Sequence, residues 1–131
     1  MLGIDTNILV RLLVADDSAQ TRRAQELVAD ATRDHGVVLV SLLVMIETEW
    51  VLRSRYELDK ATILGLLRSL LETVELSFED EPAIEEALYN WQDSSCGFAD
   101  CLIAAHNRRL GCRTTATFDK KAARLPGFIA A

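Results

Sequence analysis

The sequence has no apolar run near the roughly 20 residues that a membrane-spanning helix requires. Near the N-terminus there is no basic stretch followed by an apolar one, the pattern that a secretion signal needs. The cysteines are odd in number and lack the close paired spacing of a zinc site, so we expect reduced thiols without a function. These absences predict a cytoplasmic protein that does not associate with membranes.

Positive charge is scarce and unevenly distributed. The net charge is −6, and no Lys or Arg occurs between Arg68 and Arg108, where nine acidic residues lie. This balance argues against a protein that coats nucleic acid, because such proteins neutralise phosphates with Lys and Arg. The segment from Arg108 to Arg124, however, holds six basic residues and one acidic residue, Asp119. Although a solvated basic face is the simpler interpretation, the segment leaves one edge suited to phosphate.

No repeat, low-complexity segment or linker divides the chain, and 131 residues with 50% hydrophobic content are enough for one core. We therefore expect a single domain over residues 1–131. Short apolar runs alternate with segments of helical period, which predicts an α/β fold with a mainly parallel sheet flanked by helices. The expected strands are Leu2–Ile4, Val37–Val40, Val74–Phe78, Arg113–Thr117 and, more weakly, Phe128–Ala130.

Capping residues indicate where the helices begin. Asp17 or Ser18 suits the start of one helix, Asp59 the start of a leucine-rich one, and Pro82 the first turn of a third. The leucine-rich helix has an apolar face that suits either the core or a second subunit. Two further helices are expected near 42–56 and 98–110, and both carry candidate site residues.

Two acidic residues follow predicted strands. Asp5 follows Leu2–Ile4, and Asp119 follows Arg113–Thr117. Ligands of open α/β sheets bind at the carboxyl ends of the strands, which makes both residues candidates for a site. The alternative is that each simply caps the helix that comes next.

Two other acids fall among apolar residues on predicted helices. Glu47 shares a helical face with four residues, Leu43, Val44, Trp50 and Val51. Asp100 shares one with Ile103, Ala104 and Asn107. A buried carboxylate needs a cation, a metal or strong donors. For Glu47 the alternative is a buried ion pair with an arginine such as Arg53 or Arg11. For Asp100 it is a favourable position at a helix N-terminus.

Four carboxylates at one edge of a sheet repel one another and stay ionised only beside a compensating cation. Ligation by oxygen alone favours Mg²⁺ or Mn²⁺ over zinc. A divalent ion held in this way suggests phosphoryl chemistry with a metal-activated water. His106 and His35 have no partner at the spacing of a catalytic dyad, so we expect ordinary histidines.

Four runs together resemble the PIN-domain ribonucleases, particularly the VapC-type toxins of bacterial toxin–antitoxin pairs. They are GIDTNILVRLL at 3–13, ETEWVLRSRY at 47–56, FADCLIAA at 98–105 and TTATFDKKAARLPG at 114–127. The resemblance implies a three-layer α/β/α sandwich and metal-dependent endonucleolytic cleavage of RNA. It also implies a homodimer and inhibition by a cognate VapB-type antitoxin.

The resemblance carries residue by residue onto an acidic quartet that would hold Mg²⁺ or Mn²⁺: Asp5, Glu47, Asp100 and Asp119. It also marks four polar residues, one of which would orient a carboxylate or the attacking water: Thr6, Asn7, Thr115 and Thr117. Asn7 has the alternative role of a turn or helix-start residue. Many relatives have an acid three residues before the Asp100 position, where this chain has Gly97, which puts an auxiliary acidic contact in doubt.

Other functions stay open at this point. A receiver domain also gathers acids around Mg²⁺, but it needs an Asp after a central strand, where this chain has Ser41 and Leu42. A PIN-like domain that has lost catalysis and only binds a partner is a second alternative. A metal-dependent phosphohydrolase acting on another phosphodiester is a third, because no residue pattern reads a 2′-hydroxyl.

Overall fold

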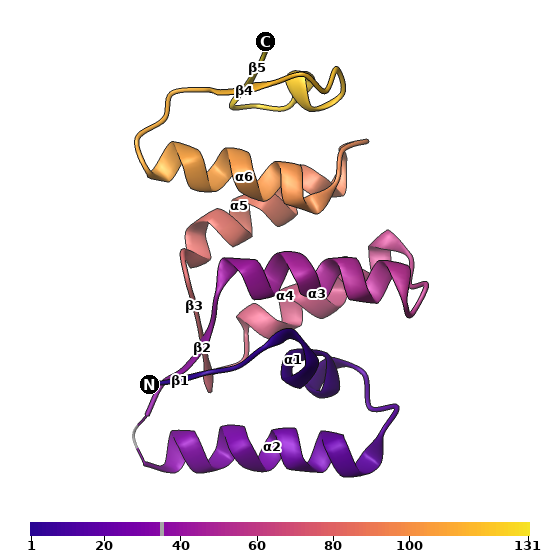
Figure 1. Cartoon of the computed structure of the whole chain (residues 1–131), viewed down its shortest axis with the longest axis vertical. Coiled ribbons are helices and arrows are strands. Elements are labelled where there is room, and N and C mark those ends of the chain that lie inside the picture. The colour runs from indigo at the N-terminus through magenta and orange to yellow at the C-terminus, as the bar shows by residue number, and fades with distance from the viewer. Residues whose placement is uncertain (35) are drawn as a thin grey trace. The chain divides into compact units, whose positions relative to one another are not determined.

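The structure is a computed structural model that describes residues 1–34 and 36–131, so the expectation for His35 lies outside the described residues. The chain divides into two compact units, Met1–Glu79 and Asp80–Ala131, and each is described by itself. Figure 1 labels the α-helices and strands of both units along the chain. That the whole chain forms one domain stays a prediction.

The first unit contains a three-stranded parallel sheet. Its strands are β1 (Leu2–Gly3), β2 (Val38–Val40) and β3 (Leu76–Phe78), in that order across the sheet. Gly3 lies beside Leu39 and Leu39 beside Ser77 in the register. Because the strands are parallel, their carboxyl ends all lie at the same edge of the sheet.

Each connection between these strands contains two helices. The helices of the first unit are α1 (Thr6–Leu13), α2 (Ser18–Arg33), α3 (Leu42–Ser54) and α4 (Lys60–Leu71). Asp17 caps α2 by accepting from the Gln20 amide at 3.0 Å, and Asp59 caps α4 by accepting from the Thr62 amide at 2.8 Å. Both predicted helix starts are confirmed.

The core of the first unit lies between the sheet and these helices. Its fully buried side chains include Leu9 from α1, Met45 from α3 and Val40 from β2. Ile63 and Leu67 of the leucine-rich helix α4 are also buried. Of the two predicted uses of that face, core packing is therefore the one that the structure shows.

The second unit is built on a pair of helices. Its elements are α5 (Glu81–Gln92), α6 (Phe98–Arg109), β4 (Thr115–Thr117), the short 3₁₀ helix η1 (Ala122–Arg124) and β5 (Phe128–Ala130). Helix α5 packs along α6. Trp91 contacts Phe98 between them, with ring centroids 5.5 Å apart, and β4 pairs with β5 in parallel.

The α/β class with parallel strands is confirmed. The first four expected strands are present at a shorter length, and the fifth, Phe128–Ala130, has the expected bounds. Pro82 lies in the first turn of α5, as predicted. None of the three cysteines forms a disulfide within the described residues. None of the helices within residues 1–34 and 36–131 is long and apolar enough to cross a membrane.

Candidate active site

Two helices begin at the carboxyl edge of the first unit's sheet. Asp5 follows β1 and accepts a hydrogen bond from the Ile8 amide at 3.1 Å, which caps α1. Ser41 follows β2 and accepts from the Val44 amide at 3.3 Å, which caps α3. The predicted capping role of Asp5 is confirmed. The positive ends of both helix dipoles favour negative charge at this edge.

A hydrogen bond joins the first two motifs within this unit. The hydroxyl of Thr6, the residue after Asp5, donates to Oε1 of Glu47 on α3. Thr6 is buried, with 5% of its surface exposed, whereas Glu47 is exposed. A fixed donor from α1 therefore holds the Glu47 carboxylate while leaving it open to solvent.

Glu47 itself is exposed, so the premise that its carboxylate is buried is wrong. Of its neighbours on that face, Leu43 and Trp50 are 79% and 48% exposed, Val44 is half-buried and Val51 is buried. The buried acid of α3 is Glu49, at 4% exposed, and it forms the ion pair with Arg53 that was considered for Glu47. The Arg53 Nε lies 2.8 Å from Glu49 Oε2, and this hydrogen bond raises the pKa of Arg53.

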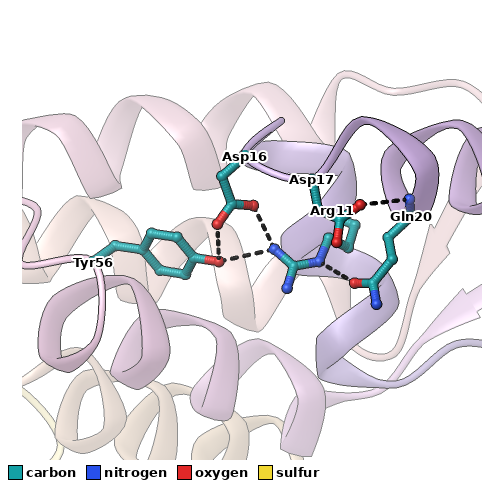
Figure 2. Close-up of polar contacts among 5 residues, drawn as sticks. All are labelled: Arg11, Asp16, Asp17, Gln20 and Tyr56. Atoms are coloured by element: carbon teal, nitrogen blue, oxygen red, sulfur yellow. Dashed lines mark hydrogen bonds and ion pairs between the residues drawn. The ribbon is translucent and has the colours of Figure 1, made fainter.

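Arg11, the other partner considered for Glu47, belongs to a different cluster, shown in Figure 2. Its Nη1 donates to Asp16 and, at 3.0 Å, to the Tyr56 hydroxyl, while its Nε donates to Gln20 at 2.6 Å. The Tyr56 hydroxyl in turn donates to Asp16 at 3.0 Å. These bonds tie the end of α1 to the α1–α2 loop, to Gln20 of α2 and to Tyr56, two residues beyond α3. Because Arg11 is engaged in them, it does not pair with Glu47, which forms no ion pair among the described residues.

In the second unit, Asp100 lies in the first turn of α6 and is half-buried. The cap residue Gly97 supplies no side-chain bond to the helix. Of the face that Asp100 shares, Ala104 is buried but Ile103 is 43% exposed. A Cβ built on Gly97 would meet Oδ2 of Asp100 at 4.0 Å, so an acid at that position would adjoin Asp100.

Asp119 fixes the turn after β4. Its Oδ1 accepts from the Lys121 amide at 2.8 Å and from the Ala122 amide at 3.1 Å, which holds the turn that leads into η1, whose N-cap is Lys121. The Thr117 hydroxyl accepts from the Asp119 amide at 3.0 Å. Thr117 therefore positions the same turn.

The remaining two supporting candidates differ. The Thr115 hydroxyl accepts from the Asn107 side-chain amide at 3.0 Å, which links β4 to α6. Asn7 is exposed in the first turn of α1. Thr6 and Thr117 are thus the candidates that contact an acid of the predicted quartet.

The predicted site residues are divided equally between the units. Asp5 and Glu47 belong to the first, where Thr6 links their elements, and Asp100 and Asp119 belong to the second. Among the described residues, no group of three or more His, Cys, Asp or Glu side chains is arranged to hold a metal. The donor chemistry nevertheless fits Mg²⁺ or Mn²⁺, because all four side chains offer carboxylate oxygens. In the part of the chain that the structure describes, none of the four forms an ion pair.

The family model of the PIN domain matches residues 3–127, nearly the whole chain. The chain belongs to the PIN domain family. PIN domains are typically nucleases and typically use divalent metals. The four acids all lie within the matched residues of this PIN domain. A search of curated proteins found no match.

Sequence reasoning missed Glu79, which follows β3 at the same sheet edge as Asp5. Its Oε1 accepts from the Leu42 amide at 2.9 Å and so provides a second cap for α3. Its position in the sequence indicated it, because Glu79 directly follows the predicted strand Val74–Phe78, just as Asp5 follows Leu2–Ile4. The rule that selected Asp5 therefore also selects Glu79 in this PIN domain.

Sequence reasoning also missed the partner of His106, which is Asp80. The His106 ring is half-buried, and its Nδ1 lies 2.6 Å from Oδ2 of Asp80, while Arg109 Nε donates to the other oxygen. Burial alone would raise the pKa of Asp80, but these two donors outweigh it and lower the pKa. The partners lie 26 residues apart, so spacing along the chain gave no indication of the pair.

Proposed function

We propose that this PIN domain is a metal-dependent endoribonuclease whose site is formed by Asp5, Glu47, Asp100 and Asp119. The observation that carries the proposal is the family match over 3–127, which includes all four acids. The lack of ion pairs at these acids in the described residues supports it, since their charge is free to bind a cation. A bound Mg²⁺ or Mn²⁺ would neutralise the phosphate and activate a water.

The chain's own residues prepare this site. The Thr6 hydroxyl restricts Glu47 to one orientation, and the turn held by Thr117 restricts Asp119. Asp5 is fixed as the cap of α1, which leaves its second oxygen available to a ligand. Such pre-oriented carboxylates lose less conformational freedom when a metal binds.

We further propose that the chain is a cytoplasmic VapC-type toxin, that it forms a homodimer, and that a VapB-type antitoxin silences it. The four motifs at 3–13, 47–56, 98–105 and 114–127 support this reading by resemblance. Expression of the chain alone in bacteria should arrest growth, and its Asp100→Asn variant should not. Light scattering after size exclusion measures the homodimer.

The first prediction separates a metal ligand from a helix cap, using Asp59 as the matched control. Asp5 and Asp59 both accept an amide hydrogen bond at a helix start, and Asn caps a helix about as well as Asp. We expect Asp5→Asn to reduce RNA cleavage about 100-fold or more, the scale of losing one pre-organised charged group. Asp59→Asn should cleave like the wild type. Cleavage of a labelled RNA with Mn²⁺, and its loss with chelator, provides the measurement.

Equal activity of the two variants would show that Asp5 is only a cap. Wild-type protein that cleaves no RNA but binds Mn²⁺ would favour a hydrolase acting on another phosphodiester. Absence of both cleavage and metal binding would favour an interaction domain without catalysis. Asp100→Asn tests the second unit in the same assay.

A further inference from the structure

A surface pocket of about 270 Å³ with polar and apolar lining lies within the second unit. It is lined at the end of α5 and in the following loop by Asn90, Asp93, Ser94 and Ser95, and around η1 by Lys121, Arg124 and the apolar Leu125. We call these seven residues the basic pocket. Ammonium, guanidinium, hydroxyl and amide groups are the side chains that contact nucleic-acid phosphates most often.

The two cations of the basic pocket are available to a ligand. In the described residues, Lys121 and Arg124 form no ion pair with an acid, although both belong to the basic C-terminal segment. Other cations of that segment are already engaged. Arg108 Nη2 lies 2.7 Å from Glu86 Oε1, and Arg109 is bound to an acid at the start of α5. Fewer basic residues of the C-terminal segment are therefore available to a phosphate than the sequence suggested. Two of the available ones, Lys121 and Arg124, line the pocket.

The pocket is continuous with both segments that carry the second unit's candidate acids. Asp119 accepts hydrogen bonds from the Lys121 amide at 2.8 Å and from the next amide at 3.1 Å, so one turn fixes Asp119 and Lys121 together. On the other side, Ser94 and Ser95 lie in the loop that leads into α6, whose first turn carries Asp100. The pocket therefore shares the Asp119 turn and adjoins, along the chain, the helix start that carries Asp100.

We propose that the basic pocket binds a backbone phosphate of single-stranded RNA beside the phosphodiester that is cleaved. This inference rests on the proposed ribonuclease function and adds a substrate contact to it. Lys121 and Arg124 provide the charge, and the Ser95 hydroxyl and Asn90 amide provide neutral donors. The Asp93 carboxylate repels the phosphate and so lowers the affinity for RNA. Its neutralisation is therefore expected to strengthen binding, the opposite of the effect expected for the two cations.

The test measures equilibrium binding of a short fluorescein-labelled single-stranded RNA to the full chain, in chelator so that no metal-dependent cleavage occurs. Lys121→Gln and Arg124→Gln should each weaken binding and reduce the slope of log affinity against log salt by about 0.7, the value for one lost contact to a single strand. Asp93→Asn should strengthen binding. Arg113→Gln and Lys120→Gln remove the same charge from the same segment outside the pocket, and they should leave the slope near that of the wild type.

Kinetics of the same variants with Mn²⁺ give a second readout. Loss of a contact made equally in ground and transition states raises KM and leaves kcat nearly unchanged. Lys121→Arg and Arg124→Lys, which keep the charge, should restore KM and the salt slope. Circular dichroism melting of each variant verifies that the fold persists.

The proposal is overturned if Lys121→Gln and Arg124→Gln bind RNA with the salt slope of the two control variants while the wild type still cleaves. In that case the pocket is better suited to an acidic segment of a protein partner. Failure of the wild type to cleave RNA is a different result, because it overturns the ribonuclease function itself.

Discussion

At the residue scale, the contact between Thr6 and Glu47 distinguishes a site from a solvated acid. Most exposed glutamates have no fixed donor, whereas Glu47 accepts from a hydroxyl that is 5% exposed and comes from another helix. Groups that orient a metal ligand typically affect affinity or activity by about 10- to 100-fold. If Glu47 holds a metal as proposed, Thr6 would act through it as a positioning residue.

The second prediction therefore concerns Thr6→Val, which preserves shape and removes the donor. We expect kcat for RNA cleavage to fall about 10-fold or more, and Thr6→Ser to restore it. Thr48 offers a matched control on α3, because it is fully buried and its hydroxyl has no partner among the described residues. Thr48→Val should leave cleavage unchanged and stability equal or higher, since it removes an unsatisfied polar group. Full activity of Thr6→Val would exclude a positioning role.

At the scale of elements, the junction after β3 is held by two adjacent carboxylates. Glu79 bonds to the start of α3 within the first unit, at 2.9 Å from the Leu42 amide. Asp80 bonds to α6 within the second unit, through His106 and Arg109. Asp80 also adopts a left-handed backbone conformation, with φ of 50°, which Asp and Asn tolerate better than most residues. Glu79 therefore fixes the end of β3 within the first unit, and Asp80 fixes the start of α5 within the second.

The third prediction is a pH-dependent loss of stability in Asp80→Asn. The pKa of Asp80 in the folded chain lies below its ordinary value of 3.8, so its ionised form stabilises the fold above that value. The contribution is lost as pH falls through the lowered pKa. Asn tolerates the backbone conformation, but its amide nitrogen would face the donors of His106 and Arg109. We therefore expect the free energy of unfolding to fall by about 1–3 kcal/mol near neutral pH.

Denaturant unfolding of both proteins over a pH series measures this difference. The gap between wild type and Asp80→Asn should narrow as the pH falls below 3.8 and close once the pH lies below the lowered pKa of Asp80, because only there is the folded wild-type carboxyl also neutral. Asp93→Asn is the control, as an exposed acid without an ion pair in the described residues. A gap that persists unchanged into acid would show that the carboxylate charge is not its source.

At the scale of the whole molecule, the candidate acids are shared between two units, each with its own packed interior. Asp5 and Glu47 belong to Met1–Glu79, and Asp100 and Asp119 to Asp80–Ala131. In the proposed function all four hold one metal site, so metal binding requires both units. A ligand that binds only the folded chain raises its stability by mass action.

The fourth prediction is that Mn²⁺ raises the melting temperature of the wild type. At 100 times the dissociation constant, mass action contributes about 2.7 kcal/mol, or roughly 8 °C for a chain of this size. Asp5→Asn and Asp100→Asn should each abolish the shift, while Asp59→Asn should retain it. If only variants of one unit abolish it, the metal site lies within that unit and the shared quartet is wrong.

The sequence alone predicted the five strands and several helix starts, and it selected the acidic set, which stays a prediction. Short apolar runs located all five strands, and Asp17, Asp59 and Pro82 located helix starts, because capping and backbone preference are local properties. The rule for strand ends selected Asp5 and Asp119 for the same reason. The resemblance of the motifs named the family that the family model then matched.

Tertiary structure decided which side chains are buried and which are paired. Helix α3 is apolar on most sides, with Leu42, Leu43, Met45 and Trp50 all on it, so periodicity does not specify a single inward face. Packing buries Glu49 and leaves Glu47 exposed.

The pairing of His106 with Asp80 likewise depends on α5 lying along α6, which brings together residues 26 positions apart. Burial and pairing are properties of neighbours in space, and only the folded chain supplies those neighbours.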